Sequence, residues 1–543
     1  MSETERPNVI LILVDDMGFS DLGCMGSEIQ TPNIDALARE GVLLSSMYNC
    51  ALCCPTRASV LTGLYAHRAG IGQMGVDFGT PAYQGHLRDD AVTIAEALRE
   101  AGYRTLMSGK WHVGGEYDAR FIDTWQPGAD GRPTPRQRGF DRFFGIVDGC
   151  THYFSPHYLM EDDERVTSFD DDFYMTDAIA DKAIEMIEEG QDDERPFFLY
   201  LAHVAPHWPL HAREEDIARY EGAYLKGWDA TRTARHEEML SRGILQHPWE
   251  ISPRDPDAPP WPSIELSDWE ARRMAVYAAM VDRMDQSIGR VLDRLKRLGE
   301  YDNTLILFLS DNGGCAELMA EDGWAKFFPD VTHDGRKMTM GNRPDVEPGG
   351  PLTYMSYDLP WANVSNTPYR KFKHWVHEGG ISTPLIAHWP DKITRHGELE
   401  ENPSHLIDLM ATAVDIAGAK YPHTYHGGET IKPMEGKSLV PAFLGQPIER
   451  EAIYWEHEGN RAVRSGDFKL VAKGATGKWE LYNIAKDRSE QKDLSEEQPE
   501  LAKKLADMWM AYAERANVLP LNPNSKRNNA QSMNKKQKRF ELK

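Results

Sequence analysis

"NVILILVDD", residues 8–16, and "NTLILFLSDNGG", residues 303–314, share one pattern, in which a short apolar run is followed by acidic residues. Continuous runs of Val, Ile and Leu of this length are typical of strands that are buried on both faces of a parallel sheet. Asp15 and Asp16 follow the first run, and Asp311 and Asn312 follow the second. Functional groups gather beyond the carboxyl ends of parallel strands, so we expect these four side chains to meet.

Helical patterns lie between and around the two predicted strands. Thr31-Pro32 opens a helix that Gly41 closes, and Thr93 with Glu96 forms a capping box. Ser267 with Glu270 starts a longer helix, whose apolar residues between 277 and 298 follow one face and predict core packing. Strands that alternate with helices predict an α/β fold, with a large mixed but mostly parallel sheet flanked by helices.

The pattern changes from about residue 441. "RAVRSGDFKLVAKG", residues 461–474, and "KWELYNI", residues 478–484, indicate short antiparallel strands, and a helix is predicted near 499–515. We therefore divide the chain into a catalytic α/β domain over 1–440, a small α+β domain with an antiparallel sheet over 441–522, and a basic tail over 523–543. The tail is typical of a solvated arm, with packing on a partner subunit as the alternative. The Gly- and Pro-rich stretch 318–366 is expected to form a lid or a pocket rim.

Composition excludes several functional classes. The chain has 61 Lys and Arg against 85 Asp and Glu, a net charge of −24, which repels nucleic acid and sulfated polysaccharide and predicts that an anionic substrate is small. We found no apolar run of about 20 residues and no basic, apolar leader, so we expect a cytoplasmic protein without a membrane partner. Six unevenly spaced cysteines argue against a disulfide framework and predict free thiols. An oligomer is compatible with the sequence.

The acids at the strand ends predict a cation site. Three carboxylates and one amide oxygen form a hard, oxygen-only set that suits Ca²⁺ or Mg²⁺ and would suit Zn²⁺ poorly. The spacing of Asp15, Asp16, Asp311 and Asn312 does not separate these two ions. Taken alone, Asp15-Asp16 is equally typical of a turn after a strand.

Three further segments carry basic residues or histidines. In "SGKWH", residues 108–112, Lys110 and His112 would point to the same side of an extended chain, although a surface lysine and a core histidine are an equally good reading. The apolar run "FFLYLA" is followed by three histidines, of which one could be catalytic: His203, His207 and His211. Lys373 by itself would be interpreted as a solvated residue.

"NCALCCPTR", residues 49–57, holds half of the six cysteines. Cys50 and Cys53 have the spacing of a redox pair or of half a zinc site, but no second C-x-x-C accompanies them. Pro55 suits the first turn of a helix that ends at Gly63. Cys53 is therefore predicted near a helix N-terminus, where backbone N–H groups favour an anion, with Arg57 about one turn further on.

"CCPTRASVLTG", residues 53–63, resembles the signature C-x-P-x-R of the sulfatase family, the formylglycine-dependent arylsulfatase type of the alkaline phosphatase superfamily. The other matching segments follow in order and cover most of the chain: Asp15-Asp16, "GKWH", "APHWP", "SDNGG" and "KFKHWVHEGG". Leu64 departs from the pattern, because the family often has a basic residue after the Gly, which puts recognition by the modifying enzyme in some doubt.

The resemblance implies a hydrolase of aryl sulfates, and the net charge favours small ones. Cys53 would be converted to formylglycine by a formylglycine-generating enzyme, and the hydrate would supply the nucleophilic oxygen. The oxygen at position 53 would bind one divalent cation, Ca²⁺ in preference to Mg²⁺, together with Asp15, Asp16, Asp311 and Asn312. Arg57 would hold the hydrate.

The remaining roles that the resemblance implies concern sulfate and protons. Lys110 and Lys373 would neutralise sulfate oxygens, and His207 with Lys373 would assist the leaving group. His112 would take a proton from the second hydroxyl and so expel sulfate. The alternatives are a phosphonate or phosphate ester hydrolase of the same superfamily, and a non-catalytic metal- or redox-binding protein.

Overall fold

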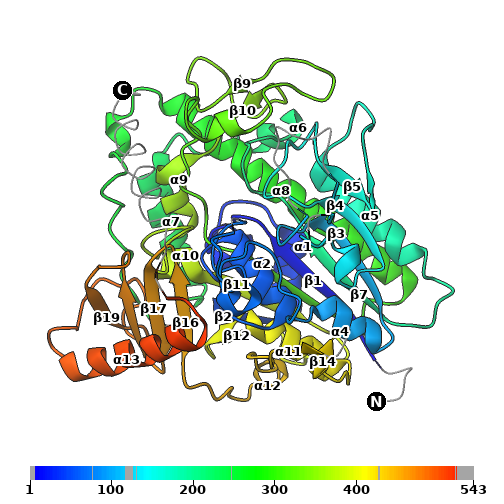
Figure 1. Cartoon of the computed structure of the whole chain (residues 1–543). Helices are drawn as coiled ribbons and strands as arrows, with labels where there is room; N and C mark the ends of the chain where they lie inside the picture. The colour runs from blue at the N-terminus through cyan, green and yellow to red at the C-terminus, as the bar shows by residue number, and fades with distance from the viewer. Residues whose placement is uncertain are drawn as a thin grey trace.

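The computed structural model describes residues 6–75, 77–115, 126–129, 131–245, 247–425, 429–519 and 521. Within these segments a large sheet lies between two layers of helices, and a smaller sheet packs at one side (Figure 1). The predicted fold class is confirmed. The basic tail over 523–543 lies outside the described residues.

The main sheet is mixed but mostly parallel. Its central order is β2-β11-β8-β1-β7-β3-β4, with bounds β2 (Val42–Tyr48), β11 (Ser382–His388), β8 (Thr304–Ser310), β1 (Asn8–Val14), β7 (Phe197–Ala202), β3 (Arg104–Lys110) and β4 (Arg142–Ile146). β11 runs antiparallel to both of its neighbours, whereas β8, β1, β7, β3 and β4 are parallel. Short strands complete the edges: β12 (Glu398–Glu400), β13 (Ser404–His405), β5 (Leu159–Glu161) and β6 (Glu164–Arg165).

The packing of β1 explains why all of its residues after Asn8 are apolar. Ile10, Ile12 and Val14 belong to one hydrophobic cluster, and Val9, Leu11 and Leu13 belong to another. The first cluster includes residues of α1 (Pro32–Glu40), α5 (Met175–Glu188) and α8 (Ser267–Leu298). The second includes residues of α2 (Cys53–Thr62), α4 (Ile94–Glu100) and α11 (Ile407–Ile416). Helices on both faces of the sheet therefore bury both sides of the strand.

The helices predicted from the sequence are confirmed. α1 starts at Pro32 and is closed by Gly41, and α4 carries the predicted capping box of Thr93 and Glu96. α8 starts at Ser267, and its apolar stripe is buried from Tyr277 to Leu295. The other helices are α3 (Ala66–Ala69), α6 (Glu214–Ile217), α7 (Gly227–Ser241), α9 (Asp358–Ser365), α10 (Glu378–Ile381) and α12 (Val440–Phe443). Among the described residues we found no helix long and apolar enough to cross a membrane.

The C-terminal region forms the predicted antiparallel sheet with one helix. The strands are β16 (Ile453–His457), β17 (Asn460–Ser465), β18 (Phe468–Ala472) and β19 (Trp479–Asn483), and the helix is α13 (Pro499–Arg515). One face of the sheet packs on α13, whereas the other contributes Trp455 and Val471 to a cluster with Ala51 and Val376. The small sheet thus supports the segments before Cys53 and after Lys373. The domain boundaries at 440 and 522 remain predictions.

The stretch 318–366 has more regular structure than its composition indicates. It contains β9 (Thr339–Met340), β10 (Thr353–Tyr354) and α9. Another two-stranded sheet, outside this stretch, pairs β14 (Thr424–Tyr425) with β15 (Glu429–Thr430). Tyr354 contacts Trp208, which follows His207, so part of the stretch lies beside the predicted site. Its role as a lid or pocket rim remains a prediction.

Candidate active site

The acidic residues at the ends of β1 and β8 lie together. These strands are parallel neighbours with Val14 opposite Ser310, so the residues that follow them leave the sheet side by side. The backbone N–H of Asp16 donates to Asp311 Oδ1 at 3.2 Å, and Asn312 Nδ2 donates to Asp16 Oδ1 at 2.7 Å. All three carboxylates and the amide are fully buried. The register of one strand pair therefore assembles the predicted oxygen set.

This oxygen set fits a hard cation. Asp15 Oδ1 and Asn312 Oδ1 are buried acceptors without a hydrogen-bond partner among the described residues. Burial and the neighbouring Asp15 raise the pKa of Asp311 to about 7, although Arg57 and Lys110 oppose them. Unpaired buried oxygens and crowded carboxylates are unfavourable unless a positive charge lies among them. Oxygen-only ligands of this kind suit Ca²⁺ or Mg²⁺.

Arg57 and Lys110 close one side of the carboxylates. Arg57 Nη2 donates to Asp311 Oδ2 at 2.8 Å, and Lys110 Nζ donates to Asp15 Oδ2 at 2.5 Å. Arg57 Nη1 also donates to the backbone oxygen of Lys110 at 2.9 Å, which ties α2 to the end of β3. Gly109, just before Lys110, lets β3 approach β7 closely, because a Cβ there would lie 1.8 Å from the carbonyl oxygen of Ala202.

Lys373 and His207 close the other side. Lys373 Nζ lies 2.9 Å from Asp16 Oδ2 and 3.4 Å from His207 Nε2. His207 Nδ1 lies 2.7 Å from the carbonyl oxygen of Trp208, which assigns the Nδ1 proton to that bond and leaves Nε2 facing Lys373. Burial lowers the pKa of His207 to about 4. Burial would also lower the pKa of Lys373, but Asp16 and other acidic neighbours outweigh it and raise that pKa well above its usual value.

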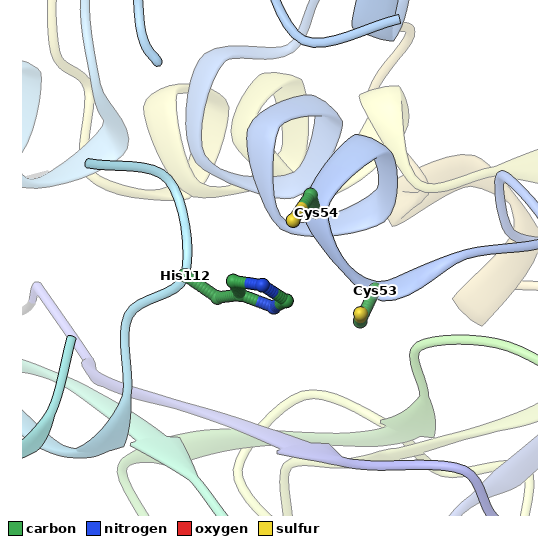
Figure 2. Close-up of side chains that lie close together, drawn as sticks. All are labelled: Cys53, Cys54 and His112. Atoms are coloured by element: carbon green, nitrogen blue, oxygen red, sulfur yellow. The ribbon is translucent and has the colours of Figure 1, made fainter. Parts of the chain in front are cut away.

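Cys53 is the first residue of α2, as its predicted position near a helix N-terminus requires. Figure 2 shows the His112 ring facing Cys53 and Cys54, and one ligand atom of each residue lies within 4.8 Å of the others. A hydrogen bond from Cys54 is the largest effect on the Cys53 thiol, and with Lys110, His112 and Lys373 it outweighs burial and lowers the pKa well below 9.0. Position 53 therefore favours a negative charge.

Lys110 and His112 both reach the site, but the chain between them is not the extended one considered above. β3 ends at Lys110, and His112 has φ 59°, so the chain between them is not extended. A left-handed turn, rather than strand alternation, directs the imidazole toward Cys53. Gly149 supports that orientation, since a Cβ there would lie 2.8 Å from the ring.

The other cysteines and histidines from the sequence analysis lie outside the oxygen cluster. Cys50 and Cys54 belong to the hydrophobic core, and Cys50 Sγ lies 3.4 Å from Ser59 Oγ. All six cysteines of the chain lie in described segments, and none of them forms a disulfide. His211 Nε2 is hydrogen-bonded to the carbonyl oxygen of Thr353, 2.6 Å away. Burial lowers the pKa of His203 to about 3. Both are buried residues of the core.

Three neighbours of the site were not predicted. Cys54 approaches His112, Trp208 packs at a tilt on His207 with ring centroids 4.4 Å apart, and Asp148 is an acidic neighbour of His112. Asp148 lies two residues after β4, as Asp16 lies two residues after β1, so the same strand-end pattern could have indicated it. No local pattern distinguished Cys54 or Trp208 from core residues.

Comparisons with known proteins agree with this site. Residues 7–419 match the sulfatase family model, and residues 369–515 match the model described as N-sulphoglucosamine sulphohydrolase, C-terminal. An uncharacterized sulfatase of Schizosaccharomyces pombe is 32% identical over 95% of both chains. An arylsulfatase of Klebsiella aerogenes is 35% identical over 81% of this chain and 92% of its own.

A solved structure has a similar fold. The crystal structure of Ps i-CgsB covers 94% of this chain and 93% of its own, with 27% identity and a TM-score of 0.65. The family match spans most of the chain, and it includes every residue of the site described above. The chain therefore belongs to the sulfatase family, within the alkaline phosphatase superfamily, and hydrolyses sulfuric esters.

Proposed function

We propose that this sulfatase hydrolyses small aryl sulfates, with Cys53 converted to formylglycine and with one divalent cation, Ca²⁺ in preference to Mg²⁺. The observation that carries the proposal is the position of Cys53. It begins α2, and both site lysines, Lys110 and Lys373, are among the groups that lower its pKa. A nucleophile at this position would meet a sulfate group between cationic side chains.

The cation would be held by Asp15, Asp16, Asp311 and Asn312 with the oxygen at position 53. The unpaired Asp15 Oδ1 and Asn312 Oδ1 support this assignment. When bound, the cation would favour ionisation of the nucleophilic hydroxyl and polarise the ester.

The chain's own residues would position the sulfate and move protons. Lys110 and Lys373 are buried ammonium groups on two sides of the carboxylates, so they would bind sulfate oxygens without reorganisation. Arg57 would orient the group at position 53 from the next turn of α2. His112 faces position 53 and would accept a proton there. His207 and Lys373, whose side-chain nitrogens are 3.4 Å apart, would assist departure of the leaving-group oxygen.

The preference for an aryl group is supported by aromatic side chains beside His207. Trp208 and Phe328 have ring centroids 5.3 Å apart, and Phe328 stacks on Tyr354 at 5.3 Å. Offset or edge contacts with such rings favour an aromatic leaving group. The net charge of −24 favours a small substrate over a polyanion, and the Klebsiella aerogenes relative is an arylsulfatase.

Formylglycine requires a modifying enzyme as a partner during maturation. Cys53 is only 2% exposed in the folded chain, which supports modification before folding is complete. The motif from Cys53 to Arg57 would then be read in an extended segment.

One experiment tests the proposed nucleophile and the proposed reaction. The chain is produced with a formylglycine-generating enzyme, the peptide that contains Cys53 is weighed, and sulfate release from 4-nitrophenyl sulfate is compared with turnover of an aryl phosphonate. We expect formylglycine at position 53 and a higher kcat/KM for the sulfate. A higher kcat/KM for the phosphonate would favour the alternative reaction, and an unmodified Cys53 with full turnover would refute the nucleophile.

A further inference from the structure

A second cluster of ligand side chains lies next to the active site and takes no part in the proposed reaction. It consists of His374, His457 and Glu458, and one ligand atom from each lies within 4.8 Å of the others. His374 follows Lys373 in the chain, whereas His457 ends β16 and Glu458 lies in the turn to β17. We propose that these three residues bind a Zn²⁺ ion, separate from the cation of the carboxylate cluster.

The distances suit a tetrahedral metal. His374 Nδ1 lies 3.2 Å from Glu458 Oε2. Two ligands bound to Zn²⁺ at about 2.0–2.2 Å with tetrahedral angles are roughly 3.3 Å apart. The rings of His374 and His457 have centroids 5.3 Å apart and cross at 82°, so small rotations bring one nitrogen of each to a shared centre.

An ordinary ion pair does not explain the environment of His457. It is 1% exposed, and neither ring nitrogen has a hydrogen-bond partner among the described residues. A buried imidazole without partners is costly, whereas a metal ion would satisfy one nitrogen directly. A simple His–Glu pair accounts for the contact between His374 and Glu458 but leaves His457 unsatisfied.

Surrounding side chains hold the ligands in place. Gln73 Nε2 donates to Glu458 Oε1 at 2.8 Å, which orients the carboxylate and leaves Oε2 toward His374. Asn460 Nδ2 donates to the carbonyl of His457 at 3.0 Å. Glu458 and Gly459 have φ 48° and 86°, as a two-residue hairpin turn requires. Outer contacts of this kind are typical of metal ligands.

The ligand types distinguish this site from the carboxylate cluster. Two imidazoles and one carboxylate suit Zn²⁺ and leave a fourth position open for water or a ligand. The backbone N–H of His374 donates to the carbonyl of Ala51 at 2.8 Å, so the site joins the segments that carry Lys373 and Cys53 to the C-terminal sheet. Bound Zn²⁺ would cross-link these segments.

Zinc binding to the full-length protein tests the proposal and does not depend on turnover. Equilibrium dialysis against Zn²⁺ is carried out with Ca²⁺ in excess, which occupies the oxygen-only cluster, and bound zinc is measured by atomic absorption. The wild type is expected to bind one equivalent more than His374→Ala or Glu458→Gln. Zinc held by Cys53, Cys54 and His112 would be the same in all three proteins. His374 and Glu458 are partly exposed, so both variants should fold.

Glu451→Gln is the matched control, because Glu451 is exposed and lies just before the same strand. It should retain the extra equivalent, and Zn²⁺ should raise the Tm of the wild type and of this control but not of the two ligand variants. Equal zinc content in the wild type and both ligand variants would overturn the site. Loss of the same equivalent in Glu451→Gln would also overturn it.

Discussion

Lys373 Nζ lies 2.9 Å from Asp16 Oδ2, although the two residues are 357 positions apart in the chain. Asp16 follows the central strand β1, and Lys373 belongs to the segment that leads into α10 and β11. Both side chains are buried, so the pair is only weakly screened by water. The contact fixes an ammonium group at the edge of the oxygen cluster.

Asp311→Asn should abolish turnover while the fold is retained. Asp311 pairs with Arg57 at 2.8 Å and accepts from the backbone of Asp16, and the amide keeps the shape of the side chain but removes the charge that a cation requires. We expect kcat for 4-nitrophenyl sulfate to fall by at least about 10²-fold, together with loss of tight Ca²⁺ binding in calorimetry. Asp391→Asn, at an exposed aspartate, is the control. Near wild-type sulfate release by Asp311→Asn would refute the metal assignment.

Cys53 should be the one modified cysteine of the cluster. The peptide with Cys53 should show a mass deficit of roughly 18 Da after production with the modifying enzyme. Cys53→Ala should lose turnover by orders of magnitude, whereas Cys50→Ala should keep most of it because Cys50 packs in the core. Cys54→Ala should also keep most of it, but as a neighbour of His112 it is the stricter comparison.

Cys53→Ser separates the mechanism from the motif. A serine hydroxyl could accept the sulfate but has no second hydroxyl to expel it, so we expect at most one turnover. Mass spectrometry should then detect sulfated serine. Full multiple turnover with an unmodified serine would contradict the mechanism.

His207→Ala should affect poor leaving groups more than good ones. With its Nε2 facing Lys373, His207 lies where a departing oxygen needs a proton. We expect kcat/KM to fall about 10²–10³-fold for phenyl sulfate and by less than about 10-fold for 4-nitrophenyl sulfate. His203→Ala, a buried histidine after the same strand, should leave the ratio of the two substrates unchanged. An equal loss for both substrates would remove His207 from leaving-group assistance.

Small sulfates should be better substrates than polymeric ones. The net charge of −24 opposes the approach of a polyanion, and this opposition weakens as salt screens it. The measurement is kcat/KM for 4-nitrophenyl sulfate against sulfate release from a sulfated polysaccharide at low ionic strength. A preference for the polymer would contradict the prediction.

Glu378 should contribute stability that acid removes. Burial alone would raise its pKa, but Lys469 and Arg488 outweigh it and lower the pKa from 4.5 to about 2. Because the folded-state pKa lies below the ordinary value, this contribution is complete above pH 4.5 and is lost as the pH falls toward 2.

Glu378→Gln tests this contribution. It leaves Lys469 and Arg488 buried with one partner fewer, and we expect a loss of about 3–5 kcal/mol in the free energy of unfolding near neutral pH. Thermal unfolding between pH 3 and pH 7 is the measurement, and the Tm of the variant should depend less on pH than that of the wild type. Glu449→Gln, at an exposed site, is the control. An unchanged pH dependence in Glu378→Gln would exclude this group as a source of acid sensitivity.

Much of the fold could be predicted because the deciding interactions are local. The unbroken apolar runs of β1 and β8 indicate burial on both faces, and the acids after Val14 and Ser310 then lie at one edge of the sheet. The helix that starts at Cys53 follows from Pro55 and the Gly63 stop. Strand burial, capping and turn preferences depend on neighbouring residues, which the sequence displays directly.

Other contacts between distant segments were decided only by the tertiary structure. β11 lies between β2 and β8 and runs antiparallel to both. Its place depends on pairing across the main sheet, which no local sequence pattern reveals. The turn at His112 has φ 59°, and its direction depends on packing against Gly149 rather than on strand alternation. The same is true of His374 and His457, which 82 intervening residues separate in the chain and which a hairpin of the C-terminal sheet brings together. Periodicity reports burial and backbone conformation along one segment, whereas these contacts are selected by the packing free energy of the whole chain.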